Sequence, residues 1–390
     1  MKSIKQAVIL AGGKGIRLRP LTLKTPKPMI KIHGKPFLEY IIELLKKNGI
    51  EKVLILTGYL HEQIENYFKD GKGSLPISYS YSPIEDDTGT RIRKAKDLLD
   101  DTFLLLYSDN YWPLDLKKLS DFYEKVGTRA LVTVYCNVDN YTKNNIFVGD
   151  KGLVEIYDKT RQASRLNGVD IGFFILKKNI LKNLPKENFS FEKVILPELI
   201  SKKQLAGFLT YHKYYGLSNL ERIPIIEEFF KPKKVILLDR DGVINKKPPK
   251  AEYIKNWEDF EFLPGVIDAL KLLSKKKYEI FIISNQAGIG RGVMTEENLK
   301  EIHRKFLEVC EKEGINIKGI YYCPHDWNEG CFCRKPKPGM FFRAAAEHHF
   351  DLTKAVFVGD DERDQQAGKA ADCKTILTQR GQSLLDVIEK

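Results

Sequence analysis

The chain has no long apolar run and few cysteines. Within its 390 residues, no stretch approaches the roughly 18 apolar residues that a membrane-spanning helix requires, which disfavours an integral membrane protein. The segment AVILAGG near the start is too short and too early for a secretion signal. With six cysteines and no export signal, we expect a cytoplasmic protein whose thiols stay reduced.

Long blocks of one charge sign are also lacking, although the formal net charge is +12. Because the lysines are scattered, most of this charge is expected on a solvated surface. Attraction of phosphorylated small molecules is a second interpretation. Nucleic acid is disfavoured as a partner, because no basic stripe interleaved with aromatic residues is present. Neither a membrane partner nor an oligomeric state is indicated.

Both halves of the chain alternate apolar runs with helical patterns. This alternation is typical of parallel sheets covered by helices, and it predicts an α/β protein with two doubly wound, mainly parallel sheets in tandem. The segment EEFFKPKK ends one pattern, and a new strand pattern starts after its proline. We therefore expect domains at residues 1–229 and 230–390.

Local signals place individual elements in both halves. AVILAGG and KVLILTG are expected as strands in the first half. PFLEYIIELLKKNG is expected as a helix, with Pro36 in its first turn and Gly49 at its end. In the second half, KKVILLD and YEIFIISN are expected as strands and PGVIDALKLLSKKK as a helix.

Three apolar runs of the second half end in polar residues, at Asp239, Ser284 and Asp360. The carboxyl ends of parallel strands meet at one edge of a sheet, so these residues should converge. Asp239 can attack phosphorus and form an aspartyl phosphate. Asp241, two residues on, can protonate the leaving oxygen and later deprotonate water. Asp360, Asp239 and the backbone carbonyl of Asp241 are candidate Mg²⁺ ligands.

Other residues near these strand ends suit phosphate binding. Ser284 and Asn285 can donate hydrogen bonds to phosphoryl oxygens. Lys335 is the candidate cation for the charge that accumulates on phosphorus.

The motifs DRDGVIN, SNQAGIGRG, CRKPKPGM and GDDERD resemble the haloacid dehalogenase superfamily of phosphatases. Within it, they resemble the branch of D-glycero-D-manno-heptose 1,7-bisphosphate phosphatase and histidinol phosphatase. The resemblance covers residues 233–390 and implies a Mg²⁺-dependent phosphomonoesterase with a minimal cap. In that branch a Lys commonly follows the motif Asp, whereas Asp361 follows Asp360 here.

Three cysteines and a histidine lie within eleven residues of the stretch CPHDWNEGCFC. Taken alone, the stretch leaves a disulfide, a metal site and a catalytic thiol open. The resemblance implies a structural Zn²⁺ site just before the RKP segment, held by Cys323, His325, Cys331 and Cys333. Four such ligands suit a closed tetrahedral site. The metal would fix the loop that presents Arg334 and Lys335.

The first half begins with a Gly-rich turn after a strand, in AVILAGGKGIRLRPLT. Backbone N–H groups in such a turn can bind phosphates. The turn lacks the P-loop pattern and fits the dinucleotide pattern poorly. The spaced cations Arg17 and Lys27 suggest triphosphate chemistry, with Arg17 stabilising departing pyrophosphate.

This half resembles the sugar-1-phosphate nucleotidyltransferases, through G-x-G-x-R-L-x-P-L-T, TPKP, TGTRIRKAKDLL, FLLLYSDN and GVDIGFFIL. The resemblance covers residues 4–228 and implies a Rossmann-like fold and Mg²⁺-dependent attack of a sugar 1-phosphate on the α-phosphate of a nucleoside triphosphate. By position, Arg17 and Lys27 would bind phosphates and Asp109 would hold Mg²⁺. The glycines that would approach the nucleotide are Gly12, Gly13 and Gly15.

Several residues depart from that family's pattern. Ile16 stands where Thr is usual, Ser108 where Gly is usual, and Arg91 where a small residue is usual. Tyr214 falls where many members have a second metal-binding aspartate. Asp170 is a candidate replacement for that carboxylate.

Together the two resemblances imply a bifunctional enzyme of nucleotide-activated heptose synthesis. A heptose 1,7-bisphosphate would lose its 7-phosphate, and the retained 1-phosphate would attack a nucleoside triphosphate, expected to be GTP. One alternative is a histidinol or other phosphatase joined to a mannose-1-phosphate guanylyltransferase. The other is an active phosphatase that carries a non-catalytic sugar-phosphate-binding domain.

Overall fold

The computed structural model describes residues 4–71, 73–182, 184–249, 251–379 and 381–389. The chain separates into two compact units, Met1–Phe230 and Lys231–Lys390. Each unit has its own sheet and its own buried core, and both are α/β as the sequence predicts. The assignment of one activity to residues 1–229 and the other to residues 230–390 stays a prediction.

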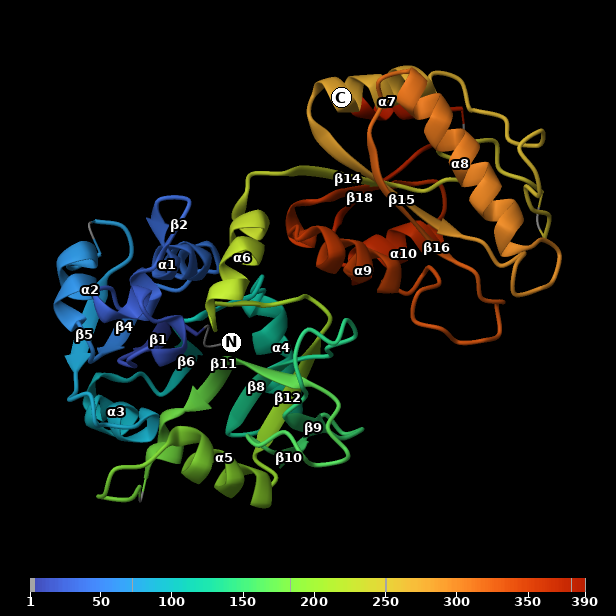
Figure 1. Cartoon of the computed structure of the whole chain (residues 1–390). Helices are drawn as coiled ribbons and strands as arrows, with labels where there is room; N and C mark the ends of the chain where they lie inside the picture. Colours follow the sequence, from blue (N-terminus) through green and yellow to red (C-terminus); the bar gives the residue numbers. More distant parts are fainter. Residues whose placement is uncertain (1–3, 72, 183, 250, 380, 390) are drawn as a thin grey trace. The chain divides into compact units, whose positions relative to one another are not determined.

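The main sheet of the first unit has the strand order β12-β8-β11-β6-β1-β4-β5 (Figure 1). Strand β11 runs antiparallel to both neighbours, and the other pairs are parallel. In that order the strands are β12 (Leu205–Thr210), β8 (Ala130–Tyr135), β11 (Val169–Lys177), β6 (Thr102–Tyr107), β1 (Gln6–Ala11), β4 (Lys52–Thr57) and β5 (Ile77–Tyr81).

Helices cover both faces of this sheet. One face carries α1 (Phe37–Lys47), α2 (His61–Phe68), α4 (Leu116–Val126) and α6 (Ile223–Phe230). The other face carries α3 (Thr88–Lys94) and α5 (Phe191–Ser201). With both faces covered, ligand space lies at the strand ends, as is usual for α/β sheets.

The sequence signals of α1 act as expected. Pro36 precedes the first helical residue, and Ile41 and Leu45, four residues apart, are fully buried on the inner side. Gly49, just past the end, has φ of 79°, a conformation that glycine adopts at little cost.

Short elements complete the first unit. Three antiparallel pairs are β2 (Lys31–Ile32) with β3 (Lys35–Pro36), β7 (Asn110–Tyr111) with β13 (Tyr215–Gly216), and β9 (Ile146–Val148) with β10 (Val154–Tyr157). The 3₁₀ helices of the chain are η1 (Ile16–Leu18), η2 (Leu21–Leu23), η3 (Lys27–Met29), η4 (Lys96–Leu98), η5 (Lys178–Leu181), η6 (Leu220–Arg222) and η7 (Leu352–Lys354).

The second unit is built on a wholly parallel sheet of order β16-β15-β14-β17-β18. The strands are β16 (Ile317–Cys323), β15 (Tyr278–Asn285), β14 (Lys234–Leu238), β17 (Val356–Gly359) and β18 (Lys374–Leu377). Since the order reverses beside β14, the strand ends around β14 border the crevice in which such folds bind ligands.

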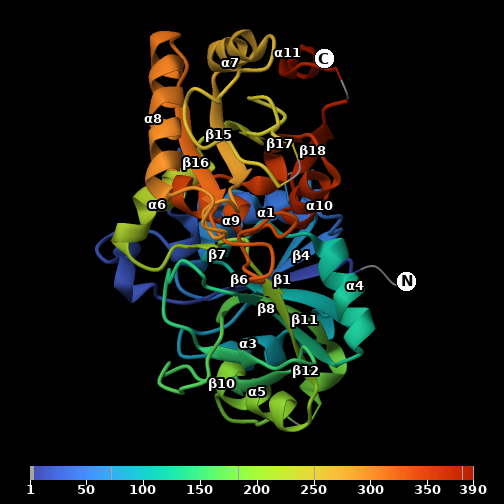
Figure 2. The same ribbon diagram turned by 90° about the vertical axis from the view of Figure 1, so that its right-hand side faces the viewer.

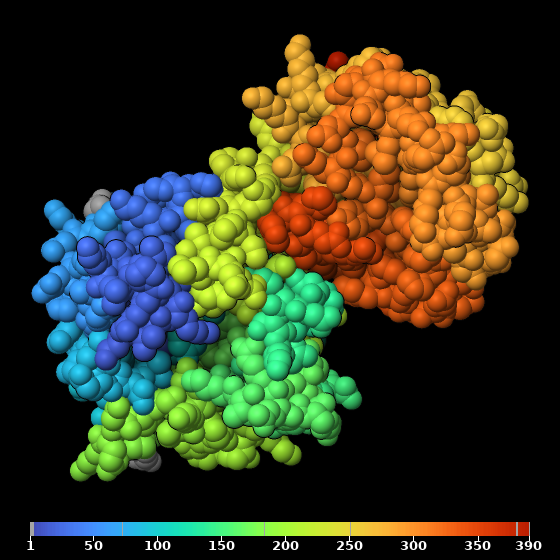
Figure 3. All heavy atoms as spheres, viewed as in Figure 1, coloured from blue at the N-terminus to red at the C-terminus, as the bar shows by residue number. Residues whose placement is uncertain are grey.

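Helices again lie on two sides (Figure 2). One buried core joins the sheet to α7 (Val266–Lys275), α8 (Glu296–Lys312) and α11 (Leu384–Ile388). On the other side lie α9 (Gly339–His348) and α10 (Glu362–Ala370), where Phe341 of α9 packs edge-on against Phe357 of β17. The outer side of α8 is exposed (Figure 3). Arg304 of this helix pairs with Glu301 and Glu308.

The described residues of the connection from β14 to α7 form no cap domain of their own. Its described residues, 239–249 and 251–265, contain neither a helix nor a sheet strand, and Asn245 is bridged to Asp241 and Phe262. The minimal cap expected from the sequence agrees with this. Across the described part of the chain, no helix is long and apolar enough to cross a lipid bilayer.

Candidate active sites and metal centre

Strand ends of the second unit open onto one cavity of about 820 Å³. Asp239 follows β14, Asn285 ends β15, and Asp364 lies in the first turn of α10 after β17; all three line this cavity. The convergence expected for Asp239 and the end of β15 is therefore present. The cavity is wide enough for a small phosphorylated ligand.

A buried lysine sits at the centre of the carboxylates. Lys335 is only 3% exposed. Its Nζ lies 2.8 Å from Oδ1 of Asp239 and 2.6 Å from Oδ1 of Asp364, and donates to the carbonyl of Ile283 at 3.2 Å. Because an unpaired buried ammonium would be very costly, these partners fix both its charge and its position.

Asp239, Asp360 and Asp364 form a group of carboxylates that could hold a cation. One oxygen from each lies within 4.8 Å of the others. Burial, together with the carboxylates of Asp364 and Asp241, raises the pKa of Asp239 to about 8 despite the lowering effect of Lys335. Three hard oxygen donors at this spacing fit Mg²⁺, which would also favour the ionised carboxylates.

Asp364 belongs to this group but is missed by the sequence analysis. Its Oδ2 accepts hydrogen bonds from the backbone N–H of Asp360 at 2.9 Å and of Asp361 at 3.3 Å. The available signal is spacing: in GDDERD, Asp364 lies four residues after Asp360, which is one helical turn.

Asp241 is held by several donors. Arg240 contacts both carboxylate oxygens, Asn245 donates at 2.9 Å and Gln286 donates at 2.9 Å. Burial alone would raise the pKa of Asp241, but Arg240 and these hydrogen bonds outweigh it, so that the pKa is lowered. The arrangement keeps Asp241 ionised, as a proton acceptor must be. Giving up a proton requires that it first acquire one.

Two residues that were expected to bind phosphate, Ser284 and Asn285, form hydrogen bonds with other residues of the chain. Ser284 is fully buried, and its Oγ accepts a hydrogen bond from Gln286 at 2.7 Å. Asn285 lines the cavity, but its amide is bonded to the backbone N–H and C=O of Lys335, both at 3.0 Å. Asn285 therefore positions Lys335, and Ser284 positions Gln286.

Arg334 keeps a free donor at the cavity. It lines the cavity, and its buried Nη1 has no hydrogen-bond partner among the described residues. A buried guanidinium nitrogen without a partner is costly, so an anion is a suitable occupant beside it.

Lys247 is a second residue that the sequence analysis missed. Its Nζ lies 2.7 Å from Oδ2 of Asp360 and 3.1 Å from Oδ2 of Asp361. Asp361 is also paired with Arg363. The carboxylate that replaces the usual Lys after the motif Asp is thus neutralised by two cations.

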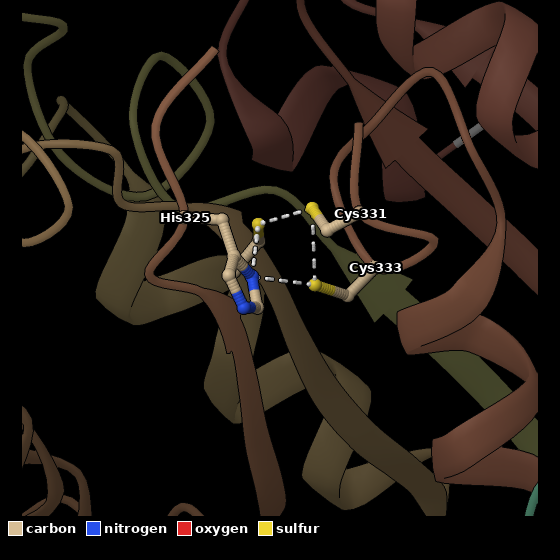
Figure 4. A group of neighbouring side chains, drawn as sticks. His325, Cys331 and Cys333 are labelled. Atoms are coloured by element: carbon tan, nitrogen blue, oxygen red, sulfur yellow. Dashed lines mark hydrogen bonds between the residues drawn. The ribbon is translucent and has the colours of Figure 1, made fainter. Parts of the chain in front are cut away.

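The four residues of the proposed zinc set lie together, three of them labelled in Figure 4. The distances from Cys323 Sγ to His325 Nδ1 and to Cys331 Sγ are 3.6 and 3.5 Å. Cys333 Sγ lies 3.2 Å from His325 Nδ1 and 3.5 Å from Cys331 Sγ. These values are close to the edges of roughly 3.4–3.8 Å that metal–ligand bonds of about 2.1–2.3 Å give a tetrahedron. The donor set therefore fits zinc.

The first unit has its own cavity, of about 450 Å³, at the Gly-rich turn after β1. Gly12, Gly13 and Gly15 line it together with Arg17 and Lys27. Gly15 has φ of 60°, which favours glycine at the turn. A side chain at Gly13 would meet open space. Thus the expected nucleotide-binding residues share one cavity.

Lys27 and Asp109 are in direct contact across this cavity. Lys27 Nζ forms an ion pair with Oδ2 of Asp109, which follows β6. Arg17 is exposed, and its guanidinium makes no ion pair or hydrogen bond among the described residues. A free guanidinium on a cavity wall is available to a polyphosphate.

The segment that follows Tyr214 borders the same cavity through Ser218, whereas Tyr214 itself does not line it. Leu217 N–H donates to the carbonyl of Asp109 at 2.7 Å, and Ser218 lines the cavity. Tyr214 packs edge-on against Tyr135 and Tyr141.

Asp170, the candidate replacement for the second metal-binding carboxylate, lies outside the residues that line this cavity. Its carboxylate accepts hydrogen bonds from Gly172 N–H at 2.7 Å and Tyr157 Oη at 3.2 Å. Burial raises its pKa to about 7. The carboxylates that do line the cavity with Asp109 are Asp86 and Asp87, which the sequence analysis did not single out.

Two family models match the chain. The nucleotidyl transferase model matches residues 6–271, beyond the end of the first unit, and the polynucleotide kinase 3 phosphatase model matches residues 234–376. D-glycero-alpha-D-manno-heptose-1,7-bisphosphate 7-phosphatase of Campylobacter jejuni is 40% identical over 144 residues, 37% of this chain and 81% of that protein. D-glycero-beta-D-manno-heptose-1,7-bisphosphate 7-phosphatase of Helicobacter pylori is 40% identical over 145 residues, which are 37% of this chain and 82% of that protein.

Solved structures resemble the first unit. HddC from Yersinia pseudotuberculosis has a TM-score of 0.51 and 25% identity, covering 58% of this chain and 100% of that chain. The same protein complexed with GMP-PN has a TM-score of 0.50. The chain therefore belongs to the nucleotidyl transferase family and, through its second unit, to the family of the heptose-1,7-bisphosphate 7-phosphatases, so it is both a sugar-1-phosphate nucleotidyltransferase and a phosphomonoesterase of the haloacid dehalogenase superfamily.

Proposed function

We propose that the second unit removes the 7-phosphate of D-glycero-D-manno-heptose 1,7-bisphosphate. The observation that carries this proposal is the buried Lys335 between Asp239 and Asp364, beside Asp360. Relatives at 40% identity are named for this reaction. The cluster presents one carboxylate to phosphorus and cations to its oxygens, as transfer of a phosphoryl group requires.

The reaction proceeds in two steps at Asp239. A carboxylate oxygen of Asp239 attacks phosphorus and the bond to the sugar oxygen breaks. Asp241, after it has taken up a proton from solvent, gives that proton to the departing sugar oxygen. Water then attacks phosphorus of the aspartyl phosphate and loses a proton to Asp241. The bond between phosphorus and Asp239 breaks, inorganic phosphate is released, and Asp239 is regenerated. Lys335 and Arg334 stabilise the phosphoryl oxygens. Mg²⁺, held by Asp239, Asp360 and Asp364, supplies further charge stabilisation when it is bound.

We further propose that Zn²⁺ binds Cys323, His325, Cys331 and Cys333. Arg334 directly follows this set in sequence, and Lys335 is the next residue. A metal at the four side chains would fix the start of the segment that carries both cations. Its role is structural, because all four ligands come from the protein.

The first unit, we propose, transfers a nucleotide from GTP to the sugar 1-phosphate that the phosphatase leaves intact. The 1-phosphate oxygen attacks the α-phosphorus of the nucleotide and pyrophosphate departs. Arg17 and Lys27 offset charge on the phosphates, and Asp109 is the carboxylate for Mg²⁺. GTP is favoured because HddC, at 25% identity, was solved with GMP-PN.

Product analysis tests both steps together. Each anomer of the bisphosphate is incubated with Mg²⁺ and GTP, ATP, CTP or UTP, and phosphate, pyrophosphate and nucleotide-sugar are measured. Both anomers are needed because, of the relatives at 40% identity, the Campylobacter jejuni enzyme carries an alpha name and the Helicobacter pylori enzyme a beta name. We expect phosphate from the bisphosphate and GDP-heptose with GTP. Phosphate without any nucleotide-sugar would remove the transferase step.

Two observations favour a second candidate, in which the first unit only binds sugar phosphate. Tyr214 occupies the expected aspartate position, and Asp170 lies outside the cavity. This candidate predicts calorimetric binding of heptose 1-phosphate with no release of pyrophosphate from any nucleotide. The pair of Lys27 with Asp109 argues for the catalytic alternative.

A further inference from the structure

Arg91 is a buried cation beside the Gly-rich turn. It has no role in either of the two proposed reactions. It belongs to α3, is 4% exposed, and lines the cavity of the first unit. The sequence comparison marked it only as a departure from a small residue. A buried arginine needs partners, so its contacts indicate its role.

All five N–H groups of its guanidinium point at backbone carbonyls. No carboxylate oxygen is among these acceptors. The acceptors are the carbonyl of Asp86 for Nε at 3.0 Å, those of Thr57 and Ser82 for Nη1 at 2.7 and 3.2 Å, and those of Pro83 and Gly12 for Nη2 at 2.8 and 3.4 Å.

These carbonyls come from three separate segments. Gly12 belongs to the turn after β1, Thr57 ends β4, and residues 82–86 follow β5. The planar fork of an arginine can hold several acceptors in one fixed geometry, whereas a lysine has three rotatable donors. Arg91 therefore ties the Gly-rich turn and the segment after β5, both of which line the cavity, to the end of β4.

Two glycines leave room for the guanidinium. A Cβ on Gly12 would lie 2.3 Å from Nη1 of Arg91, and a Cβ on Gly58 would lie 2.5 Å from the same atom. Both distances are far inside van der Waals contact. Gly58 does not line the cavity, so its lack of a side chain serves the guanidinium rather than a ligand.

The guanidinium also places a positive charge in the cavity wall. Burial lowers the pKa of Arg91, yet an arginine remains protonated in proteins. Its hydrogen-bond acceptors are neutral carbonyls, and the nearby carboxylates of Asp86, Asp87 and Glu85 offset its charge only in part, without a direct ion pair. A buried charge in low dielectric attracts a polyphosphate more strongly than an exposed one.

We propose that Arg91 is a positioning residue for nucleotide binding, which sets the shape of the Gly-rich wall and attracts the triphosphate without donating a hydrogen bond to it. This inference rests on the proposed transferase function. It differs from the roles proposed for Arg17 and Lys27, which contact the phosphates directly.

Nucleotide affinity of the full chain provides the test. GTP binding with Mg²⁺ is measured by calorimetry for the wild type, Arg91→Lys, and the matched control Arg93→Lys. Arg93 lies two residues along the same helix and donates to the carbonyls of Pro185 and Glu187. KM values for GTP and heptose 1-phosphate, and the phosphatase activity, are measured on the same samples.

We expect Arg91→Lys to weaken GTP binding about tenfold or more and to raise the KM for GTP, because the charge remains but the fork is lost. The KM for the sugar phosphate, the phosphatase activity and the control should be unchanged. Equal GTP affinity in wild type and Arg91→Lys would overturn the proposal. Because binding is measured separately, a wild type that binds GTP but transfers nothing would refute the transferase step alone.

A second variant covers the case in which Arg91→Lys fails to fold. Gly58→Ala keeps every charge and adds one methyl group 2.5 Å from Nη1 of Arg91 and 2.8 Å from the carbonyl oxygen of Gly12. We expect it to weaken GTP binding in the same direction while the phosphatase stays active. Unchanged GTP affinity in a folded Gly58→Ala protein would count against Arg91 as the determinant of the wall.

Discussion

The two units hold their functional charges in different ways. In the second unit, Lys335 and Asp364 are almost fully buried and bonded to each other. In the first unit, Arg17 is exposed, and Lys27 has one acidic partner, Asp109. We therefore expect a phosphatase site that is assembled before substrate arrives and a transferase site that is completed by its ligands.

From this difference we expect variants of the two units to differ in how far they lower stability as well as activity. Removing a member of a buried ionic network leaves a charge unpaired, which costs stability as well as activity. Removing a cation from an open cavity costs interactions with the ligand and little else. Variants of the two units should therefore separate activity from stability differently.

The largest expected effect is that of Asp239→Asn. An amide cannot form the aspartyl phosphate, so phosphatase turnover should fall by roughly 10⁴-fold or more. Nucleotidyl transfer to heptose 1-phosphate should continue at the wild-type rate. Phosphate release and nucleotide-sugar formation are followed in parallel. Asp259→Asn, an exposed change in the same connection between β14 and α7, is the control.

Loss of both activities in folded Asp239→Asn protein would contradict the independence of the units. Retention of phosphatase turnover would exclude Asp239 as the nucleophile and leave the carboxylate cluster without its proposed role.

Lys335→Met should lower both activity and stability of the second unit. The phosphoryl oxygens lose a cation, which we expect to cost about 10²–10³-fold in kcat. The carboxylates of Asp239 and Asp364 are left facing each other, at a cost of about 3 kcal/mol in the free energy of unfolding. Kinetics and chemical denaturation measure these two effects.

Lys337→Met is the matched control for Lys335→Met. It removes an exposed lysine of the same segment, which donates to the carbonyl of Gly330. We expect near-wild-type stability from it. If Lys335→Met were as stable as this control, the buried network would not be what assembles the phosphatase site.

Lys27→Met tests the opposite behaviour in the first unit. We expect transfer to fall about 10²-fold, because charge on the triphosphate is no longer offset, while the melting temperature stays within about 1 °C of the wild type. Lys24→Met, at an exposed neighbouring position, should leave both unchanged. A large loss of stability in Lys27→Met would erase the contrast between the two units.

Much of the fold followed from local signals in the sequence. Apolar runs that end in polar residues located β14, β15 and β17, because a buried parallel strand must be apolar and its end must face the ligand. Pro36 and Gly49 bracketed α1 correctly. The antiparallel course of β11 was not expected, since strand direction depends on connections that periodicity does not report.

The candidate sites were predictable where chemistry and spacing coincide. The resemblance to the phosphatase branch named Cys323, His325, Cys331 and Cys333 as one set, and the structure brings these four side chains together. Ser284 and Asn285 were expected at the end of β15, where they lie, but as phosphate ligands. Their hydrogen bonds are instead with Gln286 and Lys335, and these pairings arise only in the fold. Such long-range pairing has no local signal in a single sequence.

Cys331→Ser is expected to have the smallest effect on activity and tests what preassembles the phosphatase site. Serine is a poor zinc ligand, so metal content should fall from about one zinc per chain, and the second unit should melt about 4–8 °C lower if the loss costs about 2 kcal/mol. Phosphatase kcat should fall only a few-fold, because Lys335 keeps its contacts with Asp239 and Asp364. Cys136→Ser, a thiol of the first unit, is the control. Zinc content is measured by atomic emission and stability by calorimetry.

Unchanged zinc stoichiometry in Cys331→Ser would refute the four-ligand assignment. Lost zinc with an unchanged melting temperature would mean that the buried network of Lys335, Asp239 and Asp364 holds the phosphatase site without the metal. That outcome would make the contrast between the two units sharper still.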